Sequence, residues 1–363
     1  MKKILNMKNS VIPLILILLF FINGISFAAD IDEMTGQMII TGFKGNSIKS
    51  KGFKSVLNQV EKGGIGGVIF FEDNIKNKEE FLKMTSALKN SKAKHKPFIS
   101  IDMEGGEVQR MNENNGFKNF KSAKKAALLS EKEAYEIYFD MAKELREANI
   151  NLNFAPCVDL AVNKNSIIEQ KERSYSSDPK VVAKYAAQFI KAHYDNKIIT
   201  SIKHFPGHGS PFGDTHLGFV DATNTYTDNE LYPYLELANL NPLQTVMVSH
   251  LYNGNIDNTY PASLSYLTIE KFLRIQTDFK GVIITDDLDM GAIRKNYTLQ
   301  QIVNLAINSG ENILLFSNRE NRDEELAQEI NIIIKSGFID GTILPDNILN
   351  SYNKIIELKK SLD

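Results

Sequence analysis

The sequence predicts an α/β protein in which eight parallel strands alternate with helices. Short, nearly continuous apolar runs recur along the chain after residue 30, and helical patterns separate them. Apolar runs of this kind are typical of strands that are buried on both faces, as in a parallel sheet. The length of 363 residues suits a barrel, because barrels of repeated strand–helix units commonly reach this size. We therefore expect a (β/α)8 TIM-type barrel.

The predicted strands share a short apolar core and lie between helical segments. They are QMIIT (37–41), GVIFF (67–71), FISID (98–102), NLNFA (151–155), TSIKH (200–204), TVMVS (245–249), GVIIT (281–285) and NILLF (312–316). Repeated strand–helix units give a parallel sheet. An open doubly wound sheet is the alternative, but no glycine-rich dinucleotide fingerprint follows the first strand.

Three of the helices between and after the strands have clear sequence signals. Ser130 and Glu133 form a capping-box pattern that opens a helix. Asp178 and Pro179 supply an N-cap and a first-turn proline for the next one. The tail DNILNSYNKIIELKKSL (346–362) has the pattern of a closing amphipathic helix.

The N-terminal segment predicts export. Three lysines within the first eight residues precede the apolar run VIPLILILLFFI, and small residues follow it. This is the pattern of a secretory signal peptide, and the run is shorter than the roughly 20 residues that span a bilayer. We expect residues 1–29 to be a signal peptide cleaved after Ala28 or Ala29, and residues 30–363 to form one barrel domain. An uncleaved membrane anchor is the alternative.

Composition narrows the class of protein further. The formal net charge is −2, which lacks the basic excess of proteins that bind nucleic acid. Cys157 is the only cysteine, so no intramolecular disulfide can form and the exported domain depends on its core for stability.

Polar side chains stand at the ends of five predicted strands. In a parallel barrel the active site forms at the carboxyl ends of the strands, so residues from distant parts of the chain meet there. The candidates at these positions are Asp102, Lys203, His204, His250, Asp286 and the segment 153–159.

The segment VIITDDLDMGAI places three acids directly after an apolar strand, at positions 286, 287 and 289. Asp286 ends the strand and should project toward the barrel mouth. Asp287 should turn away and support the loop or cap the following helix. A carboxylate at position 286 could attack an anomeric carbon or bind a metal ion.

The loop KHFPGHGSPFGDTHLG (203–218) holds three of the six histidines. His204 and His208, with Asp214 and His216, could ligate zinc, but proline and glycine between the first two histidines disfavour the helix on which such pairs sit. Acid–base catalysis is the favoured interpretation, because Asp214 is close enough to orient the imidazole of His216 and stabilise its protonated form. We expect neither a metal ion nor a cofactor.

These motifs resemble a known family. KHFPGHG followed by GDTH resembles the signature of the glycoside hydrolase family 3 β-N-acetylhexosaminidases of the peptidoglycan-recycling type. Other segments occur in the order in which the family has them. They are MTGQMIITGF, GGVIFFEDNI, ISIDMEGGEVQRM, NFAPCVDL, ERSYSSDP, VMVSH, PASLS and GVIITDDLDMGAI.

The resemblance implies a role for each matching residue. Asp286 would be the nucleophile, His216 the general acid/base and Asp214 its partner. The residues that would grip a non-reducing N-acetylglucosamine are Asp102, Arg110, Arg173, Lys203 and His204. The implied activity is that of an exported, retaining exo-β-N-acetylglucosaminidase. We expect a monomer that acts on peptidoglycan-derived or related glycans outside the cell, in the wall or in the periplasm, with no nucleic acid bound and no membrane insertion after signal cleavage.

The sequence departs from the family pattern at a few positions. DMEGGE stands where Asp-Gln-Glu-Gly-Gly-Arg is usual, so Met103 and Glu107 differ, with Glu107 replacing a cation beside the pocket. Asn312 stands where an acid is common, and Lys171 where glycine often precedes the Arg173 segment. These departures bear on specificity more than on the chemistry.

Other activities stay open at this point. A β-glucosidase or an N-acetylglucosaminide phosphorylase of the same family would use the same nucleophile, and a neutral histidine would not repel phosphate as an acceptor. From other classes, a zinc-dependent amidohydrolase and a catalytically silent carbohydrate-binding protein are the alternatives.

Overall fold

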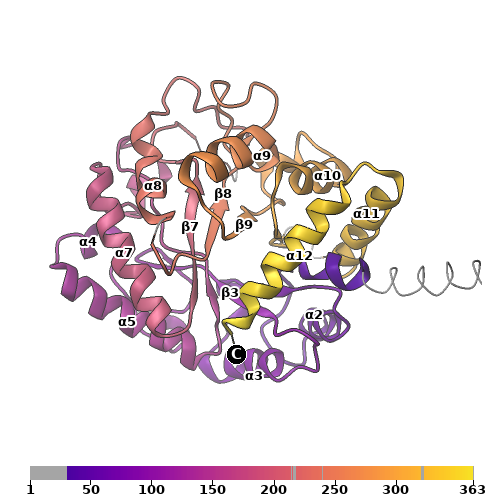
Figure 1. Ribbon diagram of the computed structural model, residues 1–363. Coiled ribbons are helices and arrows are strands. Elements are labelled where there is room, and N and C mark those ends of the chain that lie inside the picture. Colours follow the sequence, from indigo (N-terminus) through magenta and orange to yellow (C-terminus); the bar gives the residue numbers. More distant parts are fainter. Residues whose placement is uncertain (1–30, 214, 216–217, 239, 320–322, 363) are drawn as a thin grey trace, which may run out of the picture.

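The computed structural model describes residues 31–213, 215, 218–238, 240–319 and 323–362. Eight parallel strands form its central sheet, and helices surround the sheet (Figure 1). In the order in which they neighbour one another, the strands are β10 (Leu314–Phe316), β1 (Ile39–Thr41), β2 (Gly67–Phe70), β3 (Phe98–Ile101), β6 (Leu152–Asn153), β7 (Ile199–Phe205), β8 (Thr245–Val248) and β9 (Val282–Thr285).

The sheet closes on itself. A parallel bridge between Ile284 and Ile313 joins β9 to the chain entering β10, which in turn pairs with β1. Each of the eight predicted strands overlaps one strand of this sheet. The (β/α)8 TIM-type barrel is therefore confirmed, and the open doubly wound sheet is excluded.

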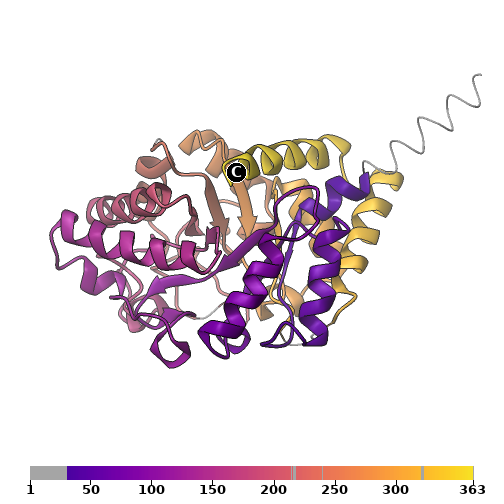
Figure 2. The ribbon, with the colours of Figure 1, turned by 90° about the horizontal axis from the view of Figure 1, so that it is seen from below.

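Eleven α-helices have bounds within the described part of the chain. They are α2 (Lys51–Glu61), α3 (Lys78–Lys89), α4 (Ala123–Ala126), α5 (Glu131–Glu147), α6 (Ile167–Gln170), α7 (Pro179–Asp195), α8 (Tyr232–Ala238), α9 (Gly291–Arg294), α10 (Leu299–Ser309), α11 (Leu326–Asp340) and α12 (Pro345–Lys360). Figure 2, turned by 90°, shows the long helices lying around the outside of the sheet. A π-helix, Leu267–Ile275, precedes β9 in the chain.

The helix ends follow the capping signals of the sequence. Ser130 donates its backbone N–H to the Glu133 carboxylate at 2.9 Å, and its hydroxyl accepts from the Glu133 N–H at 3.3 Å. Asp178 accepts from the Lys180 N–H at 2.9 Å, one residue after Pro179. These contacts satisfy N–H groups that have no partner within the helix. They set where α5 and α7 begin.

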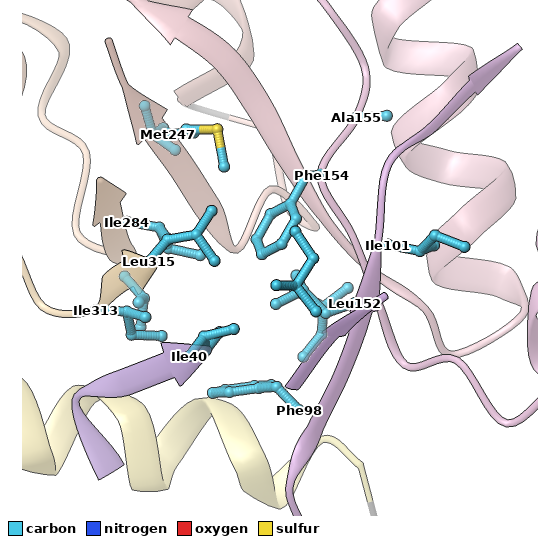
Figure 3. Close-up of a cluster of buried hydrophobic side chains, with 14 of the residues drawn as sticks. Ile40, Phe98, Ile101, Leu152, Phe154, Ala155, Met247, Ile284, Ile313 and Leu315 are labelled. Carbon is cyan, nitrogen blue, oxygen red and sulfur yellow. The ribbon is translucent and has the colours of Figure 1, made fainter. Parts of the chain in front are cut away.

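Apolar side chains fill the barrel interior (Figure 3). Phe98, Leu152 and Phe154 meet Ile284 and Leu315 from the opposite strands, and each is at most 3% exposed. Burying a side chain of this size stabilises the fold by about 1.5–3 kcal/mol. The space between the strands is thus a packed core.

One small hairpin extends the barrel above β3. Its strands, β4 (Met103–Gly105) and β5 (Val108–Gln109), pair antiparallel. Asn153 holds this hairpin, because its side chain bonds both the N–H and the carbonyl of Met103, at 2.9 and 3.0 Å. The hairpin places Glu104 and Glu107 near the carboxyl ends of the strands.

No helix in residues 31–362, apart from the few positions left undescribed, has the length and apolarity needed to span a membrane. The predicted signal peptide lies outside the described residues, so it stays a prediction.

Candidate active site

A cavity of about 190 Å³ lies at the carboxyl ends of the barrel strands. Side chains from separate strands line it, as expected for a parallel barrel. Those at or directly after a barrel strand are Ile69 and Phe71 (β2), Asp102 (β3), Lys203 and His204 (β7), Met247 (β8), Asp286 (β9) and Leu315 (β10). The structure therefore brings together most of the strand-end residues that the sequence singled out.

A buried network of charges forms one wall of this cavity. Glu104 accepts two hydrogen bonds from the Arg173 guanidinium, from Nε at 2.9 Å and from Nη2 at 2.7 Å. Lys203 Nζ lies 2.8 Å from the same carboxylate and 2.6 Å from Asp102. Bidentate pairing of this kind fixes the guanidinium plane as well as its position. Glu104 is thus the centre of the network.

Mutual attraction keeps these groups charged although they are buried. Burial alone would raise the pKa of Glu104, but Arg173 and Lys203 hold it well below its usual range. The same balance lowers the pKa of Asp102, chiefly through Lys203. Burial opposes the charge on Lys203, yet Asp102 and Glu104 raise its pKa above the ordinary value. These side chains are therefore charged and held in place by one another before a substrate binds.

Arg110 has hydrogen-bonding capacity left for a ligand. Its Nη2 lies 3.6 Å from Asp102, and its buried Nε has no hydrogen-bond partner among the described residues. A buried donor without a partner is costly, and a sugar hydroxyl would satisfy it.

Both ring nitrogens of His204 form hydrogen bonds with other residues of the protein. Nδ1 lies 2.6 Å from an Asp159 oxygen, and Nε2 lies 3.2 Å from Arg173 Nη2. Arginine can only donate, so Nε2 accepts and Nδ1 carries the proton that it donates to Asp159. His204 lines the cavity, but its ring nitrogens orient Arg173 and Asp159, and direct contact with a sugar stays a prediction.

Asp286 and Asp287 point in different directions. Asp286 lines the cavity, and its Oδ1 accepts the Asp287 N–H at 2.8 Å. Asp287 also borders the cavity, but its carboxylate accepts the N–H groups of Ser317 and Asp289 at 2.8 and 3.1 Å. Burial, with the charge of Asp289, raises the pKa of Asp287 to about 7. Asp287 thus supports the loop, as expected, and Asp286 is the better-placed carboxylate.

His250, also at a strand end, belongs to this supporting structure. It is buried, its Nδ1 lies 2.7 Å from the Ser263 hydroxyl, and its Nε2 lies 2.8 Å from the Asp287 carbonyl oxygen. Since this contact needs a donor, Nε2 carries a proton. His250 therefore anchors the segment that follows β9.

The acid–base pair predicted from the loop, Asp214 and His216, lies outside the described residues. Thr215 between them is described: its carbonyl accepts the Ala292 N–H at 3.2 Å. Ala292 belongs to α9, which begins five residues after Asp286. Thr215 therefore contacts the chain just beyond the predicted nucleophile. His208, in the same loop, is buried, which lowers its pKa to about 4.

Cys157, Asp159 and His204 form a group whose ligand atoms lie within 4.8 Å of one another. These atoms already bond to each other, because Asp159 accepts both the His204 ring N–H at 2.6 Å and the Cys157 thiol at 3.2 Å. Burial raises the pKa of the Cys157 thiol, so the thiolate that binds metal ions is disfavoured. The donor set suits a hydrogen-bonded cluster better than a cation.

One functional candidate was missed at the sequence level. Glu104 was given no role, although it is buried and holds Arg173. Asp159, which holds His204, was included only within the candidate segment 153–159 and had no role of its own. Glu104 lies two residues after Asp102, and side chains two residues apart in a strand point to the same face. This spacing was the available signal that Glu104 joins Asp102 at the site. The hairpin that directs Glu104 toward Arg173 has no hydrophobic periodicity from which it could be predicted.

The departures from the family pattern fall into two regions. Glu107 and Lys171 line the cavity and are exposed at its mouth, together with Arg319. Asn312 lies at the opposite end of the barrel, where its Oδ1 accepts the Ile283 N–H at 2.9 Å. Met103 is fully buried and does not line the cavity.

A closed parallel barrel with carboxylates and cations converging at its strand ends defines the TIM-barrel enzymes that act on polar substrates. Residues 30–356 match the Glycosyl hydrolase family 3 N terminal domain. The chain therefore belongs to glycosyl hydrolase family 3.

Known proteins similar to this chain include curated relatives and solved structures. Beta-hexosaminidase A of Pseudoalteromonas piscicida is 29% identical over 317 residues, covering 78% of this chain and 53% of that protein. Beta-hexosaminidase of Xylella fastidiosa (strain M23) is 28% identical over 300 residues, covering 80% and 86%. The structure of a glycoside hydrolase family 3 beta-N-acetylglucosaminidase from Paenibacillus sp. str. FPU-7 has a TM-score of 0.82 at 27% identity, covering 91% and 62%. This chain thus spans about half the length of the first relative.

Proposed function

We propose that the protein is a retaining exo-β-N-acetylglucosaminidase that removes terminal N-acetylglucosamine from glycans. The observation that carries the proposal is the convergence of Asp286 with the Asp102–Lys203–Glu104–Arg173 network on one cavity. The names of the relatives, beta-hexosaminidase and beta-N-acetylglucosaminidase, support it. A binding protein without activity would not require a carboxylate in the position of a nucleophile.

The described residues suit the binding of a single terminal sugar. Asp102 offers carboxylate oxygens to hydroxyl donors, while Lys203 and Arg110 offer donors to hydroxyl oxygens. The cavity of about 190 Å³ is of the size of one sugar ring. This size supports an exo mode of action.

The reaction would proceed in two displacements. Asp286 attacks the anomeric carbon while His216 protonates the leaving oxygen, and the glycosidic bond breaks as the glycosyl-aspartate bond forms. His216 then removes a proton from water, which attacks the same carbon and releases the sugar with retained configuration. Asp214 would stabilise the imidazolium formed between these steps.

The mouth of the cavity suits an acidic leaving group. Lys171 is exposed there and makes no ion pair with any residue that the structure describes. Arg319 stacks over the Phe71 ring at 4.8 Å and lies 3.6 Å from Asp73. Glu107 at the same mouth and Asp73 beside Arg319 offset part of this positive charge, so Lys171 is the cation that would attract an aglycone carboxylate, as N-acetylmuramic acid has. Peptidoglycan fragments are therefore the proposed substrates, and the N-terminal segment supports export to where they occur.

The decisive experiment uses the purified protein with 4-nitrophenyl N-acetylglucosaminide and 4-nitrophenyl glucoside. We expect turnover of the first substrate, loss of at least about 10³-fold in Asp286→Asn, and free N-acetylglucosamine as the product. Undiminished activity in that variant would remove the nucleophile assignment. A parallel reaction with inorganic phosphate, analysed by mass, distinguishes hydrolysis from phosphorolysis.

A further inference from the structure

A buried carboxylate bonds the backbone shortly before the predicted acid–base pair. Glu230 ends a short 3-10 helix, η3 (Asp228–Glu230), and is 1% exposed. Its Oε2 accepts the Gly209 N–H at 2.9 Å and the Ser210 N–H at 3.3 Å. These two amides lie between β7 and the predicted acid–base pair.

The glycines of this segment allow its close contact with Glu230. A Cβ added to Gly207 would lie 2.6 Å from the Glu230 Cβ, and Gly207 has φ of +138°, which disfavours other residues. A Cβ added to Gly209 would lie 2.0 Å from the Leu160 carbonyl oxygen on the other side. The backbone is thus confined between Glu230 and Leu160.

Asp159 fixes the same segment from the opposite side. Its Oδ1 accepts the N–H of His208 at 2.7 Å, while its other oxygen accepts the His204 ring N–H. Two buried carboxylates therefore bond the consecutive amides of residues 208–210. The mechanism assigns no chemical step to Glu230, and its Oε1 has no partner among the described residues. Burying a carboxyl group with one oxygen unpaired costs free energy, so a role other than catalysis is needed to explain Glu230.

We propose that Glu230 is a positioning residue for the acid–base segment, which it holds through the Gly209 and Ser210 amides. The segment is anchored at its start by Glu230, and Thr215 bonds α9 through Ala292 near its far end. The two contacts thus fix described residues on both sides of Asp214, at Gly209–Ser210 and at Thr215. The role rests on the proposed function, because it assigns the proton transfer to His216.

Amide exchange tests the anchoring without relying on activity. In Glu230→Ala, hydrogen–deuterium exchange at Gly209 and Ser210 should become at least about tenfold faster, because both N–H groups lose their acceptor. Glu230→Gln keeps an oxygen acceptor and should retain most of the protection. Glu144→Ala is the matched control, since Glu144 is also buried and accepts one backbone N–H, that of Lys118. Unchanged exchange at Gly209 and Ser210 in Glu230→Ala would overturn the proposal.

Leaving-group dependence tests the effect on catalysis. Glu230→Ala should lower kcat/KM for an unactivated N-acetylglucosamine disaccharide by about 10²-fold, the usual size of general acid catalysis. The loss for a dinitrophenyl glycoside should be less than about threefold, since that leaving group needs no proton. Glu230→Gln should restore the wild-type ratio, and Glu144→Ala should leave it unchanged. Equal losses on both substrates would contradict the role. A wild-type protein inactive on both would defeat the proposed function, while the exchange measurement would still decide the anchoring.

Discussion

The titration of Asp287 should make the free energy of unfolding depend on pH, and this dependence can be tested. Burial and Asp289 raise its pKa from 3.8 to about 7. Between these values the folded protein binds a proton that the unfolded chain has lost, so the free energy of unfolding decreases as the pH rises. The stabilisation that comes from protonated Asp287 in the folded protein is fully present below about pH 4 and is lost above about pH 7. A shift of about three units corresponds to about 4 kcal/mol.

The Asp287→Asn variant removes this titration with little change in shape. Its amide oxygen can still accept the Ser317 and Asp289 N–H groups. We expect the stability of the variant, relative to wild type, to increase by about 2–3 kcal/mol between pH 5 and pH 8. Urea denaturation of both proteins at each pH measures this difference, in which other titrating groups cancel. Asp346→Asn, at an exposed position on α12, is the control. A difference that does not vary with pH would refute the reasoning.

Further variants test the site and the core. Arg173→Lys loses the bidentate contact with Glu104, so kcat/KM should fall by about 10–100-fold in steady-state assays. Lys171→Gln should raise KM about twofold to fivefold for substrates with an acidic aglycone and leave neutral ones unchanged; an equal effect on both would contradict a charge contact. Burial lowers the pKa of Lys359 to about 7, so the folded state lacks a proton that the unfolded chain binds, and stability is lost as the pH falls toward 7. In denaturation assays, the free energy of unfolding of Lys359→Met minus that of wild type should therefore decrease by about 3 kcal/mol from pH 7 to 9.5. A constant difference would show that Lys359 is charged when folded.

The sequence predicted the barrel well because its signals are local. Each strand is a short apolar run, and a polar residue such as Asp102 or Asp286 marks where it ends. Parallel topology then gathers those ends on one face without any knowledge of side-chain contacts.

The supporting contacts could not be predicted in the same way. Glu104 reaches Arg173 across 69 residues, and Glu230 reaches Gly209 across 21 residues. Such contacts depend on the path of irregular segments, which have no periodicity. His204 shows the same limit: its strand-end position was informative, but its engagement with Asp159 and Arg173 became visible only in three dimensions.

The charge network on the cavity wall limits which of its residues can be substituted independently. Arg173 contacts both Glu104 and His204, and His204 contacts Asp159, which also accepts the His208 N–H. Substitutions inside this chain of contacts should therefore be strongly non-additive. Substitutions at the rim, where Glu107 and Lys171 are exposed, should change substrate preference with fewer effects on this network.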